Sequence, residues 1–332
     1  MKKSKSILSL IMCMVMLMAV ISTANAGLFD FLKPSTKCKT KYPIILVHGV
    51  CGFDKIAGFV DYWYGIPQKL SKEGATVRSA KLSAQSNNEA RGEQLLDQIL
   101  DYLADTGAKK VNIIAHSHGC TTSRYAAYMR PDLVASLTLI AGPHKGSPVA
   151  DWANEEVPPV IQDIGFSAGD LLGKIIDLLS GNDGLEQDTK GLMQHFTQEG
   201  IAYFNANYPS SGVPTCDDAY CRGSQSETFN VNGTNHVIKY YSWTGNKQMT
   251  NIFDALDYLW PVLHLINKHY GMNEDDGFVG VNGSHFGLVL NDSYPWNHAD
   301  EVNHLLGIRQ PFSADPRDVI AQHASRLKGV GL

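Results

Sequence analysis

The stretch that decides the fold is Val111-Asn112-Ile113-Ile114-Ala115-His116-Ser117-His118-Gly119. Its first five residues form an apolar run typical of a strand buried on both faces, and residues 120–128 continue in a helical pattern. Residues 115–119 must therefore turn sharply between a strand and a helix. Such a turn lifts Ser117 clear of the sheet and directs the helix N-terminus at it.

Strand and helix patterns alternate on both sides of this stretch. Alternation at this spacing predicts right-handed βαβ units and a mostly parallel sheet flanked by helices. Strands are expected over residues 42–49, 76–82, 136–141 and 237–243, and helices over residues 66–73, 88–105 and 319–328.

One region departs from this alternation. From about residue 151 to residue 208 the strand pattern disappears, and an amphipathic helical segment covers residues 170–179. With no internal repeat or low-complexity linker, we expect residues 27–332 to form one domain that carries residues 151–208 as a helical insertion.

The N-terminus predicts export. Three lysines precede an apolar run over residues 7–21, and Ala24-Asn25-Ala26 supplies the small residues that a signal peptidase requires. We therefore expect residues 1–26 to be a cleaved signal peptide. The alternative is a membrane anchor, but the apolar run is shorter than the roughly 20 residues that a spanning helix requires.

The charge and the cysteine content of the chain bear on its partners, its disulfides and its metal sites. The formal net charge is −5 with no block of lysine or arginine, which argues against a nucleic-acid partner. Cys216 and Cys221 lie close together in a polar loop, and in an oxidising compartment they are the expected disulfide. The pairing of Cys38, Cys51 and Cys120 stays open, and no cysteine spacing indicates a zinc site.

A serine hydroxyl is a poor nucleophile unless an imidazole base, oriented by a carboxylate, activates it. Downstream of Ser117, the acid is expected from Asp275 or Asp276 and the base from His298, each at the end of a strand-like stretch. An N-capping role for Ser117 is the alternative. Three other downstream histidines compete as bases: His285, His304 and His323.

Several motifs together resemble the secreted bacterial true lipases of family I, of the Pseudomonas, Burkholderia and Proteus type. The resemblance covers nearly the whole mature chain in collinear order. It is carried by residues 42–49, Gly52-Phe53-Asp54, residues 61–67, Ala115-His116-Ser117-His118-Gly119, residues 143–148, Asp276-Gly277 and residues 297–303. Ala115 stands where the G-x-S-x-G motif has its first glycine.

The resemblance implies an α/β-hydrolase fold and the activity of a triacylglycerol lipase. It also implies Ser117 as nucleophile, His298 as general base and Asp276, which precedes the motif glycine, as the acid. The oxyanion would be bound by the backbone N–H groups of Val50 and His118. His48 and His116 are interpreted as structural residues.

The resemblance further implies one structural Ca²⁺ ion. Its ligands would be the carboxylates of Asp254 and Asp300 with the main-chain carbonyls of His304 and Ile308, oxygen donors that suit calcium. Whether Asp254 or Asp257 is used stays open. The alternative interpretation is two solvated surface carboxylates.

The insertion over residues 151–208 matches the region where the family carries its lid; a helix packed permanently on the core is the alternative. The family's long-range disulfide has no second cysteine here, because Asn282 occupies that position. Some branches of the family also require a lipase-specific foldase and secretion machinery.

Three alternative functions remain. Two are enzymatic: an esterase for short soluble esters and a polyester depolymerase. The third is a non-catalytic hydrolase-fold protein that acts by binding, which normally loses the nucleophile or the base.

Overall fold

The computed structural model describes residues 34–50, 52, 55–56, 60–179, 185–216, 218–254 and 256–332. The predicted signal peptide and Cys51 lie outside these residues. None of the helices in the described part of the chain is long and apolar enough to cross a membrane.

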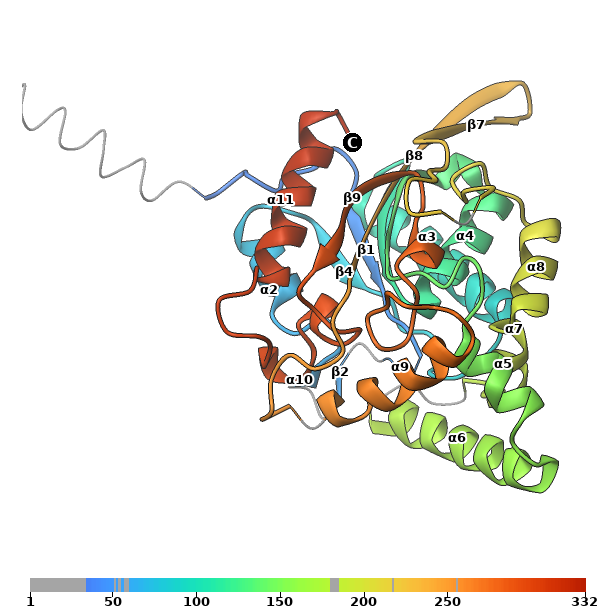
Figure 1. The fold of residues 1–332 in the computed structure, drawn as a ribbon. Coiled ribbons are helices and arrows are strands. Elements are labelled where there is room, and N and C mark those ends of the chain that lie inside the picture. The colour runs from blue at the N-terminus through green and yellow to red at the C-terminus, as the bar shows by residue number, and fades with distance from the viewer. Residues whose placement is uncertain are drawn as a thin grey trace, which may run out of the picture.

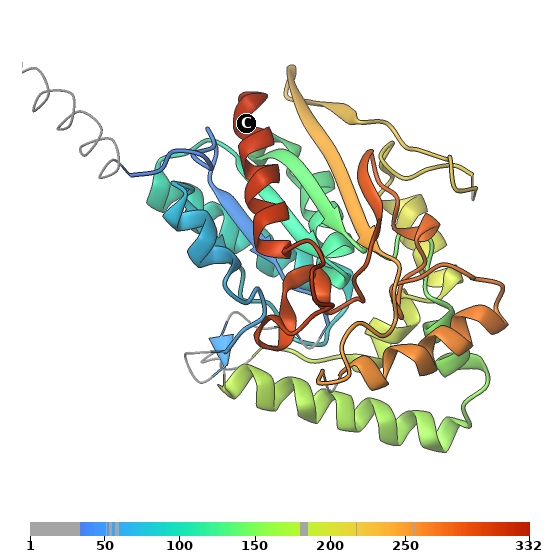
Figure 2. The same ribbon diagram turned by 60° about the vertical axis from the view of Figure 1, so that its left-hand side comes forward.

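In the described part of the chain, a seven-stranded sheet forms the centre of the molecule (Figures 1 and 2). Its order is β4-β1-β5-β6-β8-β7, with β9 also paired to β8. Only the β7–β8 pair is antiparallel, which confirms the predicted mostly parallel sheet. The strands are β1 (Ile44–Val47), β4 (Val77–Ser79), β5 (Val111–His116), β6 (Val134–Ile140), β7 (Ser226–Val231), β8 (Thr234–Gly245) and β9 (Leu288–Tyr294), with β2 (Lys55–Ile56) and β3 (Val60–Asp61) forming a separate antiparallel pair.

Helices cover both faces of the sheet, with α3 and α4 on one face and α2 and α11 on the other. The helices are α2 (Ile66–Lys72), α3 (Asn88–Thr106), α4 (His118–Met129), α5 (Pro148–Glu155), α6 (Pro159–Leu179), α7 (Thr189–His195), α8 (Gln198–Asn207), α9 (Trp260–His269), α10 (His304–Gly307) and α11 (Pro316–Gly329).

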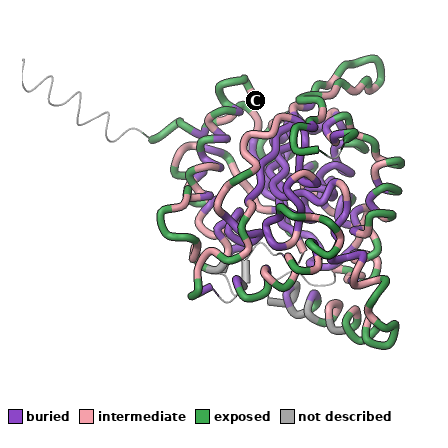
Figure 3. Tube along the Cα trace, viewed as in Figure 1, coloured by how far each residue is buried: buried purple, intermediate pink, exposed green. Residues whose placement is uncertain are grey.

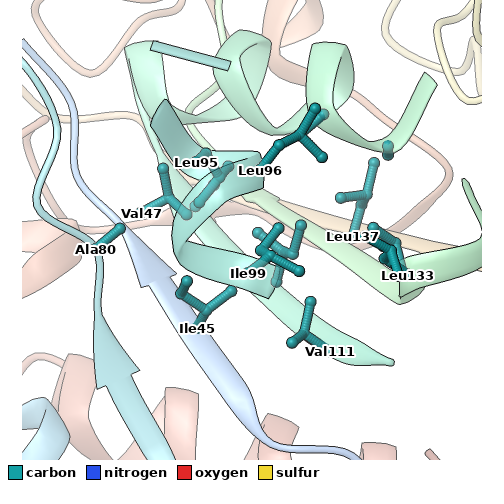
Figure 4. Packing of buried hydrophobic residues seen from close by; sticks show 14 of the residues in the cluster. Ile45, Val47, Ala80, Leu95, Leu96, Ile99, Val111, Leu133 and Leu137 are labelled. Atoms are coloured by element: carbon teal, nitrogen blue, oxygen red, sulfur yellow. The ribbon is translucent and has the colours of Figure 1, made fainter. Parts of the chain in front are cut away.

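The unbroken apolar run of β1 follows from burial on two sides. Ile45 lies in a core cluster with Leu95 of α3 (Figure 4), whereas its neighbour Ile44 lies in a second cluster with Ile66 of α2 and Ala321 of α11. Figure 3 shows the buried strands at the centre of the molecule. Because side chains alternate between the faces of a strand, every position must be apolar when both faces are covered.

The predicted helical insertion corresponds to α5, α6, α7 and α8, which follow one another between β6 and β7. Helix α6 runs along the lower edge of the molecule in Figures 1 and 2. In Figure 3 it carries mostly exposed and intermediate positions where it is described. This long, largely exposed helix sits at the same end of the molecule as α9.

Candidate active site

The turn between β5 and α4 holds Ser117 in an unusual conformation. Its φ of 56° and ψ of −126° lie outside the regions that most residues occupy. The Ser117 N–H donates to the carbonyl of Ile140 on the neighbouring strand β6 at 2.9 Å, which fixes the turn. Since α4 begins at His118, the positive end of the helix dipole points at the serine.

Glycine at position 119 is required by close packing. A Cβ atom on Gly119 would lie 2.4 Å from the carbonyl oxygen of Val47 and 2.8 Å from that of His48, closer than real Cβ contacts. A Cβ atom on Gly49 would similarly lie 2.8 Å from the Ser117 Cβ atom. The loop after β1 therefore lies directly against the nucleophile turn.

Three residues from distant parts of the chain form a continuous hydrogen-bonded row. The Nε2 atom of His298 lies 2.8 Å from the Ser117 Oγ atom, and the His298 Nδ1 atom lies 2.7 Å from Oδ2 of Asp276. All three side chains are at least nine-tenths buried. The geometry lets Nδ1–H donate to the carboxylate while Nε2 accepts the serine proton.

Asp275 and Asp276 have different partners although they are adjacent. Oδ1 of Asp276 accepts the backbone N–H groups of Phe278 and Val279 at 2.8 and 2.7 Å, so its other oxygen is held toward His298. The carboxylate of Asp275 instead lies 2.8 Å from Nδ1 of His264. The rival acid therefore faces away from the base.

The expectation that the acid and the base each follow a strand is correct for His298 and wrong for Asp276. His298 comes soon after β9, but Asp276 follows α9 and lies in a tight turn, closed by an isolated antiparallel bridge between Asp275 and Gly280. The carboxylate is positioned by local N–H donors in this turn, which takes over the role expected of a strand end.

Arg91 on α3 holds the loop that follows β1. Its guanidinium is fully buried and donates to the carbonyl oxygens of His48, at 2.6 Å, and Ser83. The His48 ring accepts the Leu82 N–H at Nε2, so its Nδ1–H donates to the Gly49 carbonyl at 2.9 Å. Burial, with Arg91 nearby, lowers the pKa of His48 to about 3, which agrees with a structural role.

A second buried polar row lies beside His298. The Tyr62 hydroxyl is 2.6 Å from Nδ1 of His116, and His116 Nε2 is 3.3 Å from Oε2 of Glu301. The rings of His116 and His298 have their centroids 4.5 Å apart. Although the ligand atoms of His116, His298 and Glu301 lie close enough for a metal ion, both His298 nitrogens already have partners.

Sequence reasoning missed Arg91, Glu301 and the pairing of Tyr62 with His116. Arg91 lies one turn into an amphipathic helix, where a basic side chain normally faces solvent. Tyr62 lies within a motif that pointed to the family, but the motif does not reveal its partner. Burial raises the pKa of Glu301 well above its usual value, and repulsion from Asp276 acts in the same direction.

Two of the predicted calcium ligands, Asp254 and Asp300, lie near a third carboxylate, that of Asp257. Asp254, Asp257 and Asp300 are all buried. Asp257 accepts hydrogen bonds at both oxygens, from the Thr250 N–H at 2.5 Å and from Nδ2 of Asn297 at 2.6 Å. Oδ1 of Asp300 is buried without a hydrogen-bond partner among the described residues. Burial raises the pKa of Asp300 to about 7, and repulsion from Asp257 and Asp254 acts in the same direction.

Cys216 and Cys221 form a disulfide, as predicted. Cys38 and Cys120 are buried free thiols, and burial raises the pKa of both, for Cys38 to about 12. Neither is therefore an activated nucleophile. The question of a Cys51–Cys120 contact falls outside the described residues.

Known proteins resemble this chain in both sequence and fold. The family model for the alpha/beta hydrolase fold matches residues 42–170. A triacylglycerol lipase of Vibrio cholerae is 46% identical over 297 residues, covering 89% of this chain and 90% of its own. Triacylglycerol lipases of Burkholderia plantarii and Pseudomonas fragi are 38% and 36% identical, covering 90% and 88% of this chain and 88% and 98% of their own. The mature lipase BlEst2 of Bacillus licheniformis shares the fold with a TM-score of 0.53 and 18% identity, covering 79% of this chain and 87% of that chain.

The parallel sheet, the strand-turn-helix at Ser117 and the matched family model define the class as an alpha/beta hydrolase. The full-length relatives narrow this class, because identities of this size over most of both chains do not arise between unrelated families. The chain belongs to the bacterial triacylglycerol lipase family.

Proposed function

We propose that this chain hydrolyses carboxylic esters through an acyl-enzyme on Ser117 and that its substrates are triacylglycerols. The observation that carries the proposal is the row from Asp276 through His298 to Ser117, with distances of 2.7 and 2.8 Å. The names of the related triacylglycerol lipases support the choice of substrate.

In the proposed reaction, Ser117 Oγ attacks the ester carbonyl carbon while its proton passes to Nε2 of His298. Asp276 stabilises the resulting imidazolium. The tetrahedral intermediate collapses, and the alcohol leaves with the proton from His298. Water then attacks the acyl-enzyme, His298 accepts one of its protons and returns it to Ser117 Oγ, and the fatty acid is released.

The proposed oxyanion donors are the backbone N–H groups of Val50 and His118. Two contacts support them: the loop carrying Val50 is held against Ser117, and His118 begins the helix at the nucleophile. Losing one such donor typically costs roughly 3 kcal/mol of transition-state stabilisation. Since the donors are main-chain groups, the side chains at these positions are free to serve packing.

A structural Ca²⁺ ion is proposed at Asp254 and Asp300, with the carbonyls of His304 and Ile308. Asp300 has a buried, unpartnered carboxylate oxygen, whereas Asp257 is satisfied by N–H donors, so the cluster favours Asp254 over Asp257. When bound, the ion would neutralise the buried carboxylates. Asp300 lies two residues from His298, so this neutralisation would steady the turn that carries the base.

Helix α6 is the proposed lid. Its first turns expose Val160, Ile161 and Ile164, whereas its middle is tied to the body by Gln85 Nε2, which donates to the Gly169 carbonyl at 2.9 Å. A helix with exposed apolar residues in its first turns suits binding to an oil surface when the lid opens. Hydrolysis with no step at the emulsion threshold would contradict a mobile lid.

Export through residues 1–26 is also proposed, and an intact mature N-terminus at Gly27 in culture medium would support it. A foldase and secretion machinery are proposed partners. Full recovery of activity after denaturation, with no other protein present, would contradict dependence on a foldase.

The decisive experiment measures purified protein on emulsified triolein and on a series of p-nitrophenyl esters. Substantial hydrolysis of triolein, abolished by Ser117→Ala in a folded protein, supports the proposal. Hydrolysis confined to short soluble esters would favour an esterase, and release of monomers from a polyester film would favour a depolymerase. Folded wild type without turnover would leave the binding-protein alternative.

A further inference from the structure

Several segments that carry solvent-exposed apolar side chains lie at the lower end of the molecule in Figure 1. Residues 249–254 and 256–258, helix α9 and helix α6 all lie at this end in both Figure 1 and Figure 2. Their exposed large apolar residues are Val160, Ile161, Ile164, Leu171, Met249, Ile252, Phe253, Tyr258, Leu259, Val262 and Leu265. Single exposed apolar residues are ordinary, but a concentration of them at one end of a molecule indicates an interaction surface.

In the loop before α9, apolar residues are exposed and acidic residues are buried. Ile252 and Phe253 are 64% and 83% exposed, whereas Asp254 and Asp257 are buried. Within residues 249–265 there is no lysine, arginine or glutamate, so the exposed part of the segment carries no charged side chain. Such a surface fits hydrocarbon better than it fits a charged headgroup or an acidic or basic protein.

Hydrogen bonds hold the loop before α9 in place. Oδ2 of Asp257 accepts the N–H groups of Thr250 and Asn251 at 2.5 and 2.6 Å. The Tyr258 hydroxyl donates to the carbonyl of Ile252 at 2.9 Å. These bonds hold the backbone at residues 250–252, so this backbone loses little conformational freedom when a surface covers the loop.

The same segment contacts the catalytic histidine. Trp260, the first residue of α9, packs its indole against the His298 imidazole with centroids 5.9 Å apart. Asn297, next to His298, donates to Asp257 at 2.6 Å. A lipid surface seated on this loop and on α9 would therefore lie beside the site that acts on its esters.

We propose that Ile252 and Phe253 form a fixed anchor that inserts into the hydrocarbon of a lipid surface, independently of any movement of α6. The proposal rests on the proposed lipase function and names the part of the chain that holds the enzyme on its substrate. It differs from the lid, because the anchor is present in the structure described here and requires no opening.

The test uses the Ser117→Ala protein, so that binding is measured without turnover. Flotation with phosphatidylcholine vesicles containing triolein is compared for this parent and for Ile252→Ser/Phe253→Ser. Because two exposed apolar side chains lose their transfer into hydrocarbon, the partition coefficient should fall roughly 10- to 100-fold. The matched control is Tyr220→Ser/Val237→Ser, which changes one exposed aromatic and one exposed aliphatic residue outside these segments and should partition like the parent.

A second measurement tests the proposal in case the loop double variant does not fold. Phe253→Trp should show quenching of tryptophan fluorescence by vesicles with brominated acyl chains beyond that of the parent. Equal partition of the parent and the loop double variant, or no added quenching, would overturn the proposal. So would loss of partition only in Val160→Ser/Ile164→Ser, which would assign binding to the lid.

Sedimentation without lipid tests a second copy of the chain as the occupant. Self-association of the parent that the loop double variant abolishes, together with no vesicle binding, would overturn the lipid anchor. Turnover of a soluble ester by the wild type tests the catalytic proposal separately, since the flotation experiment requires none.

Discussion

The Nδ1 atom of His298 lies 2.7 Å from Oδ2 of Asp276, although residues 276 and 298 are separated by the whole of strand β9. The backbone repeats this contact, because the His298 N–H donates to the Asp276 carbonyl at 2.9 Å. Two hydrogen bonds between the same two residues fix both the position of the loop and the orientation of the imidazole. These two hydrogen bonds predict that Asp276, and not the neighbouring Asp275, supports catalysis.

Asp276→Asn should lower kcat on a soluble ester by roughly 10²- to 10⁴-fold, because the amide no longer stabilises the imidazolium or selects its tautomer. Asp275→Asn is the matched control, since its carboxylate contacts His264. A larger loss of kcat in Asp275→Asn than in Asp276→Asn, with both proteins folded, would contradict the assignment.

Gly119→Ala should destabilise the protein by about 1–3 kcal/mol, because the added methyl group meets the carbonyl oxygens of Val47 and His48. Activity should fall as well, since these carbonyls lead into the loop of Val50. Thermal unfolding and ester hydrolysis measure the two effects. Gly165→Ala on exposed α6, where a Cβ meets no atom within 4 Å, should instead be neutral or stabilising by up to about 1 kcal/mol. A similar melting temperature for both variants would argue against tight packing at Gly119.

Calcium should raise the melting temperature of the wild type, by an amount corresponding to about 2.7 kcal/mol at a concentration one hundred times its Kd. EDTA should remove the increase. Asp254→Asn and Asp300→Asn should each abolish the response, because each removes a carboxylate from the proposed site. Asp163→Asn on exposed α6 should keep it. If EDTA changed neither melting temperature nor activity, the proposed ion would be absent.

His323 should make the protein sensitive to acid. Burial, with Arg326 nearby, lowers the pKa of His323 to about 3, and its Nε2 lies 2.8 Å from the Thr138 hydroxyl. The unfolded chain takes up this proton below a pH of about 6.5, whereas the folded protein does not. The contribution of His323 to the free energy of unfolding is therefore fully present above pH 6.5 and is lost as the pH falls toward 3.

The slope attributable to one such histidine is about 1.4 kcal/mol per pH unit. Urea unfolding at several pH values between 6 and 4 should show a shallower pH dependence for His323→Gln than for the wild type. His269→Gln, which changes an exposed ring, serves as the control. An identical slope for wild type and His323→Gln would disprove the contribution.

The elements with strong local patterns could be predicted from the sequence. The β5 strand, the turn at Ser117 and helix α4 follow from an apolar run joined to a helical pattern, and both patterns act over a few neighbouring residues. Strand β7 was not expected, and β9 was expected only as a strand-like stretch before His298. Their residues are largely intermediate or exposed, so they lack the apolar run that marks a buried strand.

The sequence and the tertiary structure determined different features of this protein. The sequence by itself determined a strand-turn-helix with a serine at its apex, a mostly parallel sheet, and the positions of candidate partners through motif order. The residues alone left Asp275 and Asp276 open, and the family resemblance favoured Asp276. The tertiary structure gives the physical reason, because adjacent side chains in a tight turn point in different directions according to the N–H groups around them. It also distinguished the satisfied carboxylate of Asp257 from that of Asp300. The buried contacts of Arg91 with the loop after β1 likewise depend on how α3 packs against β1, which local patterns do not encode.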